Sequence, residues 1–279
     1  MSLFYSQKEL KKATDFNQKT IGFVPTMGAL HDGHLALVKQ SLLENEITVV
    51  SIFVNPTQFN NASDLEKYPR TLENDVIKLM SCSSEILVYA PSVSDIYEEN
   101  VVSESFNFDG IENQMEGKFR PGHFNGVGTI VKKLFEILHP TKAYFGEKDF
   151  QQLQIVKKLV KNYHLPVNII GCPIYREDNG LAMSSRNERL TVDERKKASI
   201  IYETLQEVKN IFGIKNVKEI NDYVKEVFEK EVFFELEYFT IAKETTLEEL
   251  ENIDNQCKYI AFIAVFVNNI RLIDNISLN

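Results

Sequence analysis

Short apolar runs alternate along the first part of the chain with stretches in which hydrophobic residues recur at helical spacing. The runs occupy residues 21–24, 47–54, 86–89, 143–145 and 167–170, and the helical stretches follow His34, Leu72, Val127 and Phe150. Strands that alternate with helices indicate parallel β-α-β units. The run 47–54 is almost wholly apolar, which is typical of a central strand covered on both faces. The pattern predicts an α/β domain on a parallel sheet, whose first strand we expect Pro25 to end.

The pattern changes after Cys172, where a polar loop leads into a different set of elements. Thr191 and Glu194 form a capping-box sequence, which predicts a helix from there to about residue 212. A second helix is expected at 217–231, and alternating strands at 234–242 and 259–267 precede the C-terminal segment NIRLIDNI. We therefore expect two domains, residues 1–174 with the parallel sheet and residues 175–279 as a smaller α+β domain with an antiparallel sheet. At the other end, residues 1–16 predict a short amphipathic helix.

Composition and charge narrow the class of protein. The chain has 279 residues, of which 43% are hydrophobic and 25% are charged, as in an ordinary globular protein. Its formal net charge of −9 argues against a general nucleic-acid binder, because affinity for the phosphate backbone requires an excess of Lys and Arg. No segment approaches the roughly 18 apolar residues of a membrane span, and none has the pattern of a secretion signal. We expect neither a nucleic-acid partner nor a membrane partner.

The spacing of the cysteines and acidic residues does not point to a metal site. Cys82, Cys172 and Cys257 are far apart in the sequence and form no Cys-x-x-Cys motif. They indicate neither a disulfide framework nor structural zinc, and they fit the reducing cytoplasm, where we expect the protein. No cluster of Asp or Glu compels a metal site either.

The segment PTMGALHDGH, residues 25–34, joins the first apolar run to a helix and is the strongest chemical signal in the chain. Backbone N–H groups at a helix N-terminus attract phosphate oxygens, and Gly28 and Gly33 allow a ligand to approach the backbone. His31 and His34 are three residues apart, so on a helical turn they point to one face and offer two ring donors to a polyphosphate. The alternative is a polar helix entry with Asp32 as the cap and both histidines solvated.

Two further polar motifs follow apolar runs and are expected at the same edge of the sheet, where ligands of such folds bind. Asn55 and Gln58 in FVNPTQF carry neutral amides that suit a carboxylate or hydroxyls, although a turn cap also explains Asn55. In GEKDFQQL, Lys148 could reach phosphate oxygens and Asp149 a ribose hydroxyl. The alternative for this pair is Asp149 as a helix cap with Lys148 solvated.

Two loops outside these motifs also carry candidate residues. Arg120 and His123 lie in a Pro-Gly turn before a helix expected to start near Val127, either as an anion-facing helix entry or as a solvated surface turn. The segment 183–186, with the sequence MSSR, offers two hydroxyls and a guanidinium that could neutralise a departing pyrophosphate. A plain interdomain linker is the alternative for that segment.

Taken in their order and spacing, PTMGALHDGH, SIFVNPTQF, YPRT, RPGHFNGV, YFGEKDFQQL and REDNGLAMSSRN closely resemble the pantothenate synthetase family, the pantoate–β-alanine ligases of the H-x-G-H nucleotidyltransferase superfamily. The resemblance covers roughly residues 20–195 and continues more weakly to NIRLIDN. It implies a Rossmann-like N-terminal domain, a smaller C-terminal lid domain, a homodimer and magnesium-dependent use of ATP. The implied reaction condenses pantoate with β-alanine through a pantoyl adenylate, giving pantothenate, AMP and pyrophosphate on the way to coenzyme A.

The resemblance also implies roles for individual residues. The catalytic set is His34, as the family's proton donor, with His31, Lys148 and Arg186. The implied ATP-binding residues are Met27, Gly28, Ala29, Leu30, His31, Asp32, Gly33, His34, Gly146, Glu147, Lys148, Asp149, Tyr175, Met183, Ser184, Ser185 and Arg186. The implied pantoate-binding residues are Gln58 and Gln152, with the neighbouring positions Asn55, Arg120 and His123, and Gln58 also serves β-alanine. The chain departs from the family at Tyr175, where valine is usual and the backbone contacts adenine.

Two other functions fit parts of this pattern. An H-x-G-H adenylyltransferase could transfer AMP to a phosphate ester, but Gln58 and Gln152 are neutral and suit a carboxylate better. A nucleotide-binding regulator without turnover would not need the full set of His31, His34, Lys148 and Arg186.

Overall fold

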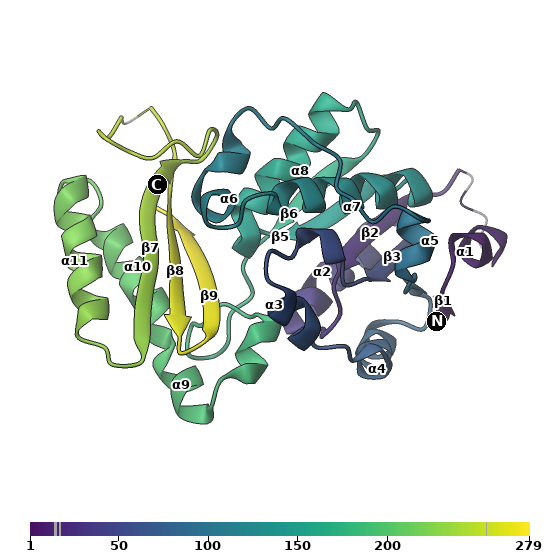
Figure 1. The fold of residues 1–279 in the computed structure, drawn as a ribbon, viewed down its shortest axis with the longest axis horizontal. Helices are drawn as coiled ribbons and strands as arrows, with labels where there is room; N and C mark the ends of the chain where they lie inside the picture. The colour runs from purple at the N-terminus through teal and green to yellow at the C-terminus, as the bar shows by residue number, and fades with distance from the viewer. Residues whose placement is uncertain (14–15, 17, 255) are drawn as a thin grey trace. The chain divides into compact units, whose positions relative to one another are not determined.

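The computed structural model describes residues 1–13, 16, 18–254 and 256–279 (Figure 1). This part of the chain divides into two compact units, one of Met1–Glu147 with Gln151–Pro173 and the other of Lys148–Phe150 with Ile174–Asn279. The domain boundary at residue 174 remains a prediction. The short segment Lys148–Phe150 belongs to the second unit although the stretches on either side of it belong to the first.

In the first unit, the described residues form a parallel sheet of six strands in the order β1-β4-β3-β2-β5-β6. The strands are β1 (Ser2–Phe4), β2 (Ile21–Thr26), β3 (Ile47–Ile52), β4 (Leu87–Tyr89), β5 (Lys142–Gly146) and β6 (Asn168–Cys172). The predicted fold class is confirmed. Val49 and Val50 in β3 are completely buried, as expected of an apolar strand with neighbours on both sides and both faces covered.

Helices connect these strands and cover the sheet (Figure 1). They are α1 (Gln7–Ala13), α2 (Asp32–Glu44), α3 (Ala62–Lys67), α4 (Leu72–Cys82), α5 (Val93–Tyr97), α6 (Met115–Phe119), α7 (His123–Leu138) and α8 (Phe150–Asn162). The 3₁₀ turns are η1 (Pro56–Gln58), η2 (Ile111–Asn113) and η3 (Glu147–Asp149). Leu35 and Val38 of α2 pack with Val24 of β2 in one buried apolar cluster. None of the described helices is long and apolar enough to cross a membrane.

The strand order creates a topological switch point between β2 and β5. From β2 the chain proceeds to β3 and β4 on one side of the sheet, and it later returns to β5 and β6 on the other side. The loops that leave the carboxyl ends of β2 and β5 therefore diverge, which opens a crevice at this place in open α/β sheets. The segments 27–34 and 147–152 follow these two strand ends.

Three details of the first unit differ from the sequence-based expectation. Residues Ser2–Phe4 form a strand paired with Leu87–Tyr89, and helix α1 begins at Gln7; the end of the expected helix, Thr14 and Asp15, lies outside the described residues. Helix α7 begins at His123 rather than near Val127. Strand β1 pairs with a strand that is distant in the sequence, so no local pattern predicts it. The glycines of α7 weaken its helical pattern, so the sequence does not mark where this helix begins.

Pro25 lies inside β2 instead of ending it, because its nitrogen faces a side of the strand that is no longer paired. Thr26 accepts a hydrogen bond from the N–H of Phe53, so Thr26 faces the β3 side. Alternation along a parallel strand then turns Pro25 toward β5, whose pairing with β2 ends at Phe23. No ladder donor is lost there, which is the condition under which a strand accepts proline.

In the second unit, the described residues form a three-stranded antiparallel sheet of β7 (Phe234–Lys243), β8 (Tyr259–Val267) and β9 (Ile270–Ser277). Its helices are α9 (Val192–Lys197), α10 (Ser199–Ile211) and α11 (Val217–Glu229), preceded by the 3₁₀ turn η4 (Ser185–Arg189). The helix expected from residue 191 to about 212 is interrupted at Ala198, which is completely buried and has a ψ of −8°. Tertiary packing here overrides a continuous helical pattern.

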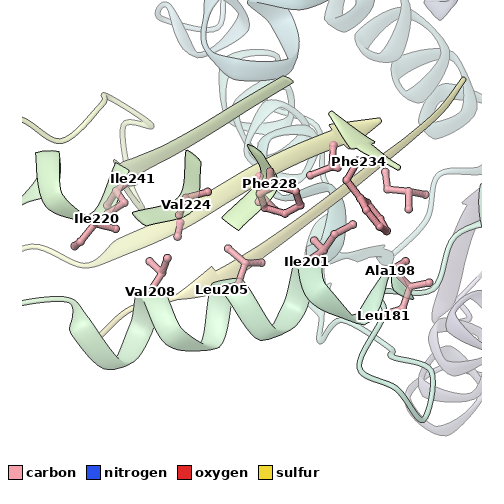
Figure 2. Packing of buried hydrophobic residues seen from close by; sticks show 14 of the residues in the cluster. Leu181, Ala198, Ile201, Leu205, Val208, Ile220, Val224, Phe228, Phe234 and Ile241 are labelled. Atoms are coloured by element: carbon pink, nitrogen blue, oxygen red, sulfur yellow. The ribbon is translucent and has the colours of Figure 1, made fainter. Parts of the chain in front are cut away.

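Helical spacing explains the core of the second unit. Ile201, Leu205 and Val208 form a buried stripe on α10, and Val224 and Phe228 on α11 belong to the same apolar cluster (Figure 2). The sheet contributes the rest of the cluster, including Ile241, which is 2% exposed. This core also holds β9 in place, which carries the buried polar residues Asp274 and Asn275.

Candidate active site

His31 and His34 lie side by side where α2 begins. His31 is the N-cap, with an extended backbone, and α2 starts at Asp32, so Asp32 is an exposed residue of the first turn and not the cap. The ring centroids of the two histidines are 4.0 Å apart, and their planes are inclined by 39°. The two imidazoles thus form one cluster at the helix N-terminus, where the backbone carries partial positive charge.

A hydrogen bond identifies the donor nitrogen of His34. Its Nδ1 accepts from the backbone N–H of His31 at 3.3 Å, in a reciprocal capping box at the start of α2. A ring nitrogen that accepts a hydrogen bond carries no proton, so the neutral ring carries its proton at Nε2. Nε2 is therefore the nitrogen of His34 that can donate to a phosphate oxygen.

The backbone N–H groups of the loop before α2 bind acceptors within the protein. The N–H of Gly28 donates to Thr26 Oγ1 at 3.2 Å, and that of His31 donates to His34. Between them, the N–H groups of Ala29 and Leu30 donate to one carboxylate, that of Asp75. The loop is thereby held by hydrogen bonds within the protein.

That carboxylate belongs to Asp75, a residue of α4 that the sequence pattern did not single out. Asp75 is 1% exposed, and its two oxygens accept from the N–H of Ala29 at 3.0 Å and of Leu30 at 2.7 Å. Thr71 Oγ1 donates to the same carboxylate at 3.2 Å. Gly28 has a φ of +83° beside it, and a Cβ there would lie 3.1 Å from Asp75 Oδ2. Asp75 thus shapes the histidine-bearing loop from outside the motif.

The side chain of Gln58, in the motif FVNPTQF, contacts Met27 in the motif PTMGALHDGH. It is 8% exposed at the end of η1, and its Nε2 lies 2.9 Å from Sδ of Met27. Asn55 Nδ2 donates to Gln58 Oε1 at 3.3 Å and to the carbonyl of Gly126 at 3.1 Å, while Asn55 Oδ1 accepts from Tyr97 Oη at 2.6 Å. The side chain of Asn55 is therefore engaged within the protein and orients Gln58.

The N-terminal end of α7 fixes the backbone of Gln58. The carbonyl of Gln58 lies 2.7 Å from Nδ1 of buried His123 and 3.4 Å from a guanidinium nitrogen of Arg120. A Cβ on Gly126 would lie 2.4 Å from the carbonyl oxygen of Thr57, so only glycine permits this approach of α7 to η1. Arg120 and His123 therefore lie beside Gln58, and both contribute to its position.

The two glutamines of GEKDFQQL have different environments. Gln151 is 3% exposed; its Nε2 donates to the carbonyls of Ile111 and Gln114, both at 2.8 Å, and its Oε1 accepts from the N–H of Glu116. It ties the loop before α6 to α8. Gln152, the predicted pantoate ligand, is the next residue of α8 and is partly exposed.

The backbone at the carboxyl end of β5 has open space beside it. Gly146 is its last residue, and a Cβ added to it would meet no described heavy atom within 4 Å outside its chain neighbours. Glu147 opens η3 directly after it.

The remaining predicted residues belong to the second unit. Lys148 Nζ lies 3.5 Å from Asp149 Oδ2; the Lys148 side chain is 17% exposed and that of Asp149 is 48% exposed. Lys148 is thus largely enclosed by protein rather than solvated. Both residues lie in η3, directly before α8.

Residues 175–184 form a compact turn that leads into η4. The N–H of Met183 donates to the carbonyl of Tyr175 at 2.9 Å, and the Tyr175 side chain is exposed. Ser184 caps η4 by accepting from the N–H of Arg186 at 3.2 Å, and Ser185 is buried. The MSSR segment therefore caps and begins η4.

Fold and site geometry together define a class of protein, α/β enzymes that carry an H-x-G-H motif at the switch point of a parallel sheet. Residues 2–277 match the pantoate-beta-alanine ligase family. The chain belongs to this family, as its motifs predicted, and is a ligase.

Individual relatives are similar to this chain over almost their whole length. A pantothenate synthetase of Flavobacterium psychrophilum is 62% identical over 281 residues, which cover 100% of both chains. The crystal structure of pantothenate synthetase from Thermus thermophilus has a TM-score of 0.92 and 38% identity, covering 100% of this chain and 99% of that one. A pantoate-beta-alanine ligase from Francisella tularensis, solved with beta-gamma ATP and β-alanine, has a TM-score of 0.83 and 37% identity, covering 100% and 98%.

Proposed function

We propose that this chain condenses (R)-pantoate with β-alanine at the expense of ATP, giving pantothenate, AMP and pyrophosphate through a pantoyl adenylate. Family membership supports the overall reaction. The observation that carries the proposal is the 2.9 Å approach of Gln58 Nε2 to Met27 Sδ. It places a neutral amide, suited to a carboxylate or a hydroxyl, beside the motif that carries His31 and His34.

In the first step, a carboxylate oxygen of pantoate forms a bond to the α-phosphorus of ATP while the bond from that phosphorus to the departing pyrophosphate breaks. Gln58 and Gln152 orient pantoate, with Asn55, Arg120 and His123 supporting Gln58. The protein contributes position and charge stabilisation rather than covalent chemistry.

His31, His34, Lys148 and Arg186 stabilise the charge that accumulates on the phosphates. The Nε2–H of His34 donates to a phosphate oxygen, because its Nδ1 is occupied by the backbone N–H of His31. Lys148 and Arg186 supply cations to the leaving pyrophosphate. The other nucleotide contacts fall to the backbone of Tyr175, to Asp149 at the ribose and to Ser184 and Ser185 at the phosphates.

In the second step, the amine of β-alanine attacks the acyl carbon of the adenylate beside Gln58, and AMP leaves. The amine attacks in its neutral form, so one proton is released as the amide forms. AMP is a much better leaving group than oxide, which is why the carboxylate is first adenylated.

We further propose that Mg²⁺ enters bound to ATP. Among the described residues no group of three or more His, Cys, Asp or Glu could hold a metal ion. The triphosphate itself offers the hard oxygen ligands that Mg²⁺ prefers, and the ion neutralises part of its charge.

We also propose a homodimer in the cytoplasm. The family resemblance supports the dimer, which light scattering during size-exclusion chromatography tests. The cysteines Cys82, Cys172 and Cys257 are all free, which fits a reducing compartment.

Isotope exchange between ATP and pyrophosphate tests the proposed first step. Exchange that requires pantoate but not β-alanine is expected, because adenylation is complete before the amine reacts. Exchange without pantoate, or none in its presence, would contradict the proposal. A phosphate ester that replaces pantoate in this assay would favour an adenylyltransferase instead.

A further inference from the structure

Strand β9 carries two adjacent buried polar residues within an apolar sheet. Asp274 is 3% exposed and Asn275 is 5% exposed, between Ile273 and Ile276 of the same strand. Burial of a carboxylate or an amide is costly unless each finds hydrogen-bond partners. The partners of Asp274 and Asn275 therefore indicate what this part of β9 holds in place.

Asn275 holds the backbone of Lys148. Its Nδ2 donates to the carbonyl oxygen of Lys148 at 2.9 Å, across 127 positions of sequence. Phe150, two residues further along, packs its ring 6.0 Å from that of Phe262 on the neighbouring strand β8. The segment Lys148–Phe150 is thus anchored on the second unit by one polar and one aromatic contact.

Asp274 holds the turn that precedes the MSSR segment. Arg176 makes a bidentate ion pair with Asp274 at 2.6 and 3.0 Å and donates to the carbonyl of Gly180 at 3.0 Å. The guanidinium also lies 3.7 Å from the ring centre of Tyr202. Burial raises the pKa of Asp274, whereas Arg176 and, at longer range, Lys148 act to lower it.

The two arrangements are joined within β9. Asp274 Oδ1 accepts from the backbone N–H of Asn275 at 2.8 Å, and Arg176 also lies 3.4 Å from the carbonyl of Asn275. The guanidinium of Arg176 thus binds both oxygens of Asp274, which compensates the buried charge of this carboxylate. One buried network therefore contacts the backbone of Lys148 and the turn Arg176–Gly180, which precedes the MSSR segment.

We propose that Asn275 is a positioning residue for Lys148. This inference rests on the proposed contact of Lys148 with the phosphates of ATP. Asn275 acts through the backbone of Lys148 and touches no substrate itself.

Asn275→Ala tests the proposal in ATP–pyrophosphate exchange with pantoate present. We expect exchange to fall about 10- to 100-fold, because small displacements of a charged group reduce transition-state stabilisation strongly. Asn279→Ala is the matched control: Asn279 Nδ2 donates to the carbonyl of Cys257 at 2.9 Å in the same unit, away from Lys148. Exchange in Asn275→Ala equal to that in the control would overturn the proposal.

A double-mutant cycle with Lys148→Ala separates positioning from general support of the fold. If Asn275 acts through Lys148, Asn275→Ala reduces exchange in the wild-type background but has little further effect in Lys148→Ala. Equal losses in both backgrounds would overturn the proposal, since they indicate a structural role. Asn275→Ser provides a second variant if alanine prevents folding, and thermal unfolding of each variant checks this.

The same cycle distinguishes failure of the proposed function from failure of this inference. If Lys148→Ala alone retains near-normal exchange, the phosphate role of Lys148 is wrong, and the positioning role falls with it. If Lys148→Ala abolishes exchange while Asn275→Ala does not reduce it, the phosphate role stands and the positioning role alone is wrong.

Discussion

The carboxylate of Asp75 accepts a 2.7 Å hydrogen bond from the backbone N–H of Leu30, a residue 45 positions earlier in the chain. A second bond, from Ala29, makes Asp75 the anchor of the loop that ends at the paired histidines. Lys78, one helical turn after Asp75 in α4, donates to the carbonyl of Leu30. Helix α4 thus binds two backbone N–H groups and one backbone carbonyl of this loop.

Asp75→Asn should weaken adenylation, because an amide cannot accept all the hydrogen bonds that the carboxylate accepts. We expect ATP–pyrophosphate exchange to fall about tenfold and the free energy of unfolding to fall by about 1–3 kcal/mol, the cost of leaving a buried donor unsatisfied. Glu73→Gln is the control, since Glu73 is an exposed acid in the first turn of the same helix. Exchange as high in Asp75→Asn as in Glu73→Gln would remove Asp75 from this role.

His34→Ala should lower turnover by about 10²- to 10³-fold, the loss typical of one preorganised donor at developing charge. The effect should appear in pantoate-dependent ATP–pyrophosphate exchange and not in a later step. His34→Gln retains a side-chain donor and should recover part of the rate. If His34→Ala forms the adenylate at a near-normal rate, His34 does not act on the phosphates.

Gly126→Ala should raise the KM for pantoate at least about tenfold, because the added Cβ would lie 2.4 Å from the carbonyl of Thr57 and displace η1, which carries Gln58. Steady-state kinetics with pantoate varied at saturating ATP measures this. Gly128→Ala lies in the same helix but faces the ring of Phe106, so it should alter stability and leave the KM for pantoate unchanged. Equal KM values for the two variants would argue against this role of Gly126.

Acid should destabilise the first unit partly through Glu44. Hydrogen bonds from Lys142, Gln40 and Tyr144 lower the pKa of the Glu44 carboxyl from 4.5 to about 2. The stability it contributes is present above pH 4.5 and is lost as the pH falls toward 2, because the unfolded chain takes up the proton first. Chemical denaturation at a series of pH values should show a shallower loss in this window for Glu44→Gln than for the wild type. If the free energy of unfolding falls equally with pH in Glu44→Gln and in the wild type, Glu44 does not contribute to the acid sensitivity.

Local pattern predicted most of the fold because its strands and helices are strongly periodic. The buried strand β3, the antiparallel pair β7 and β8 and the helix α11 occur close to where the pattern places them. The short strand β1 and the interruption at Ala198 could not be predicted, since distant pairing and packing determine them.

In the candidate site, too, some residues could be identified from local motifs, whereas others depend on contacts between distant parts of the chain. The chemistry-bearing side chains, such as His34, Gln58 and Lys148, occur in motifs whose position after strand ends is visible in the sequence. Their supports, Asp75 and Asn275, bind backbone atoms 45 and 127 positions away, and a single sequence carries no signal for such pairs. An isolated Asp in α4 looks the same whether it is solvated or holds a loop.

Because Lys148–Phe150 belongs to the second unit, the chain cannot be divided into two fragments at residue 173 without breaking contacts of this segment. A fragment that ends at residue 173 would keep this segment but lose the ring of Phe262 and the amide of Asn275, so the apolar ring of Phe150 and the carbonyl of Lys148 would face water. Neither unit can therefore be replaced alone by the corresponding unit of a related enzyme. A chimaera with a related enzyme must exchange β8 and β9 together with the segment Lys148–Phe150, because Asn275 and Phe262 contact that segment.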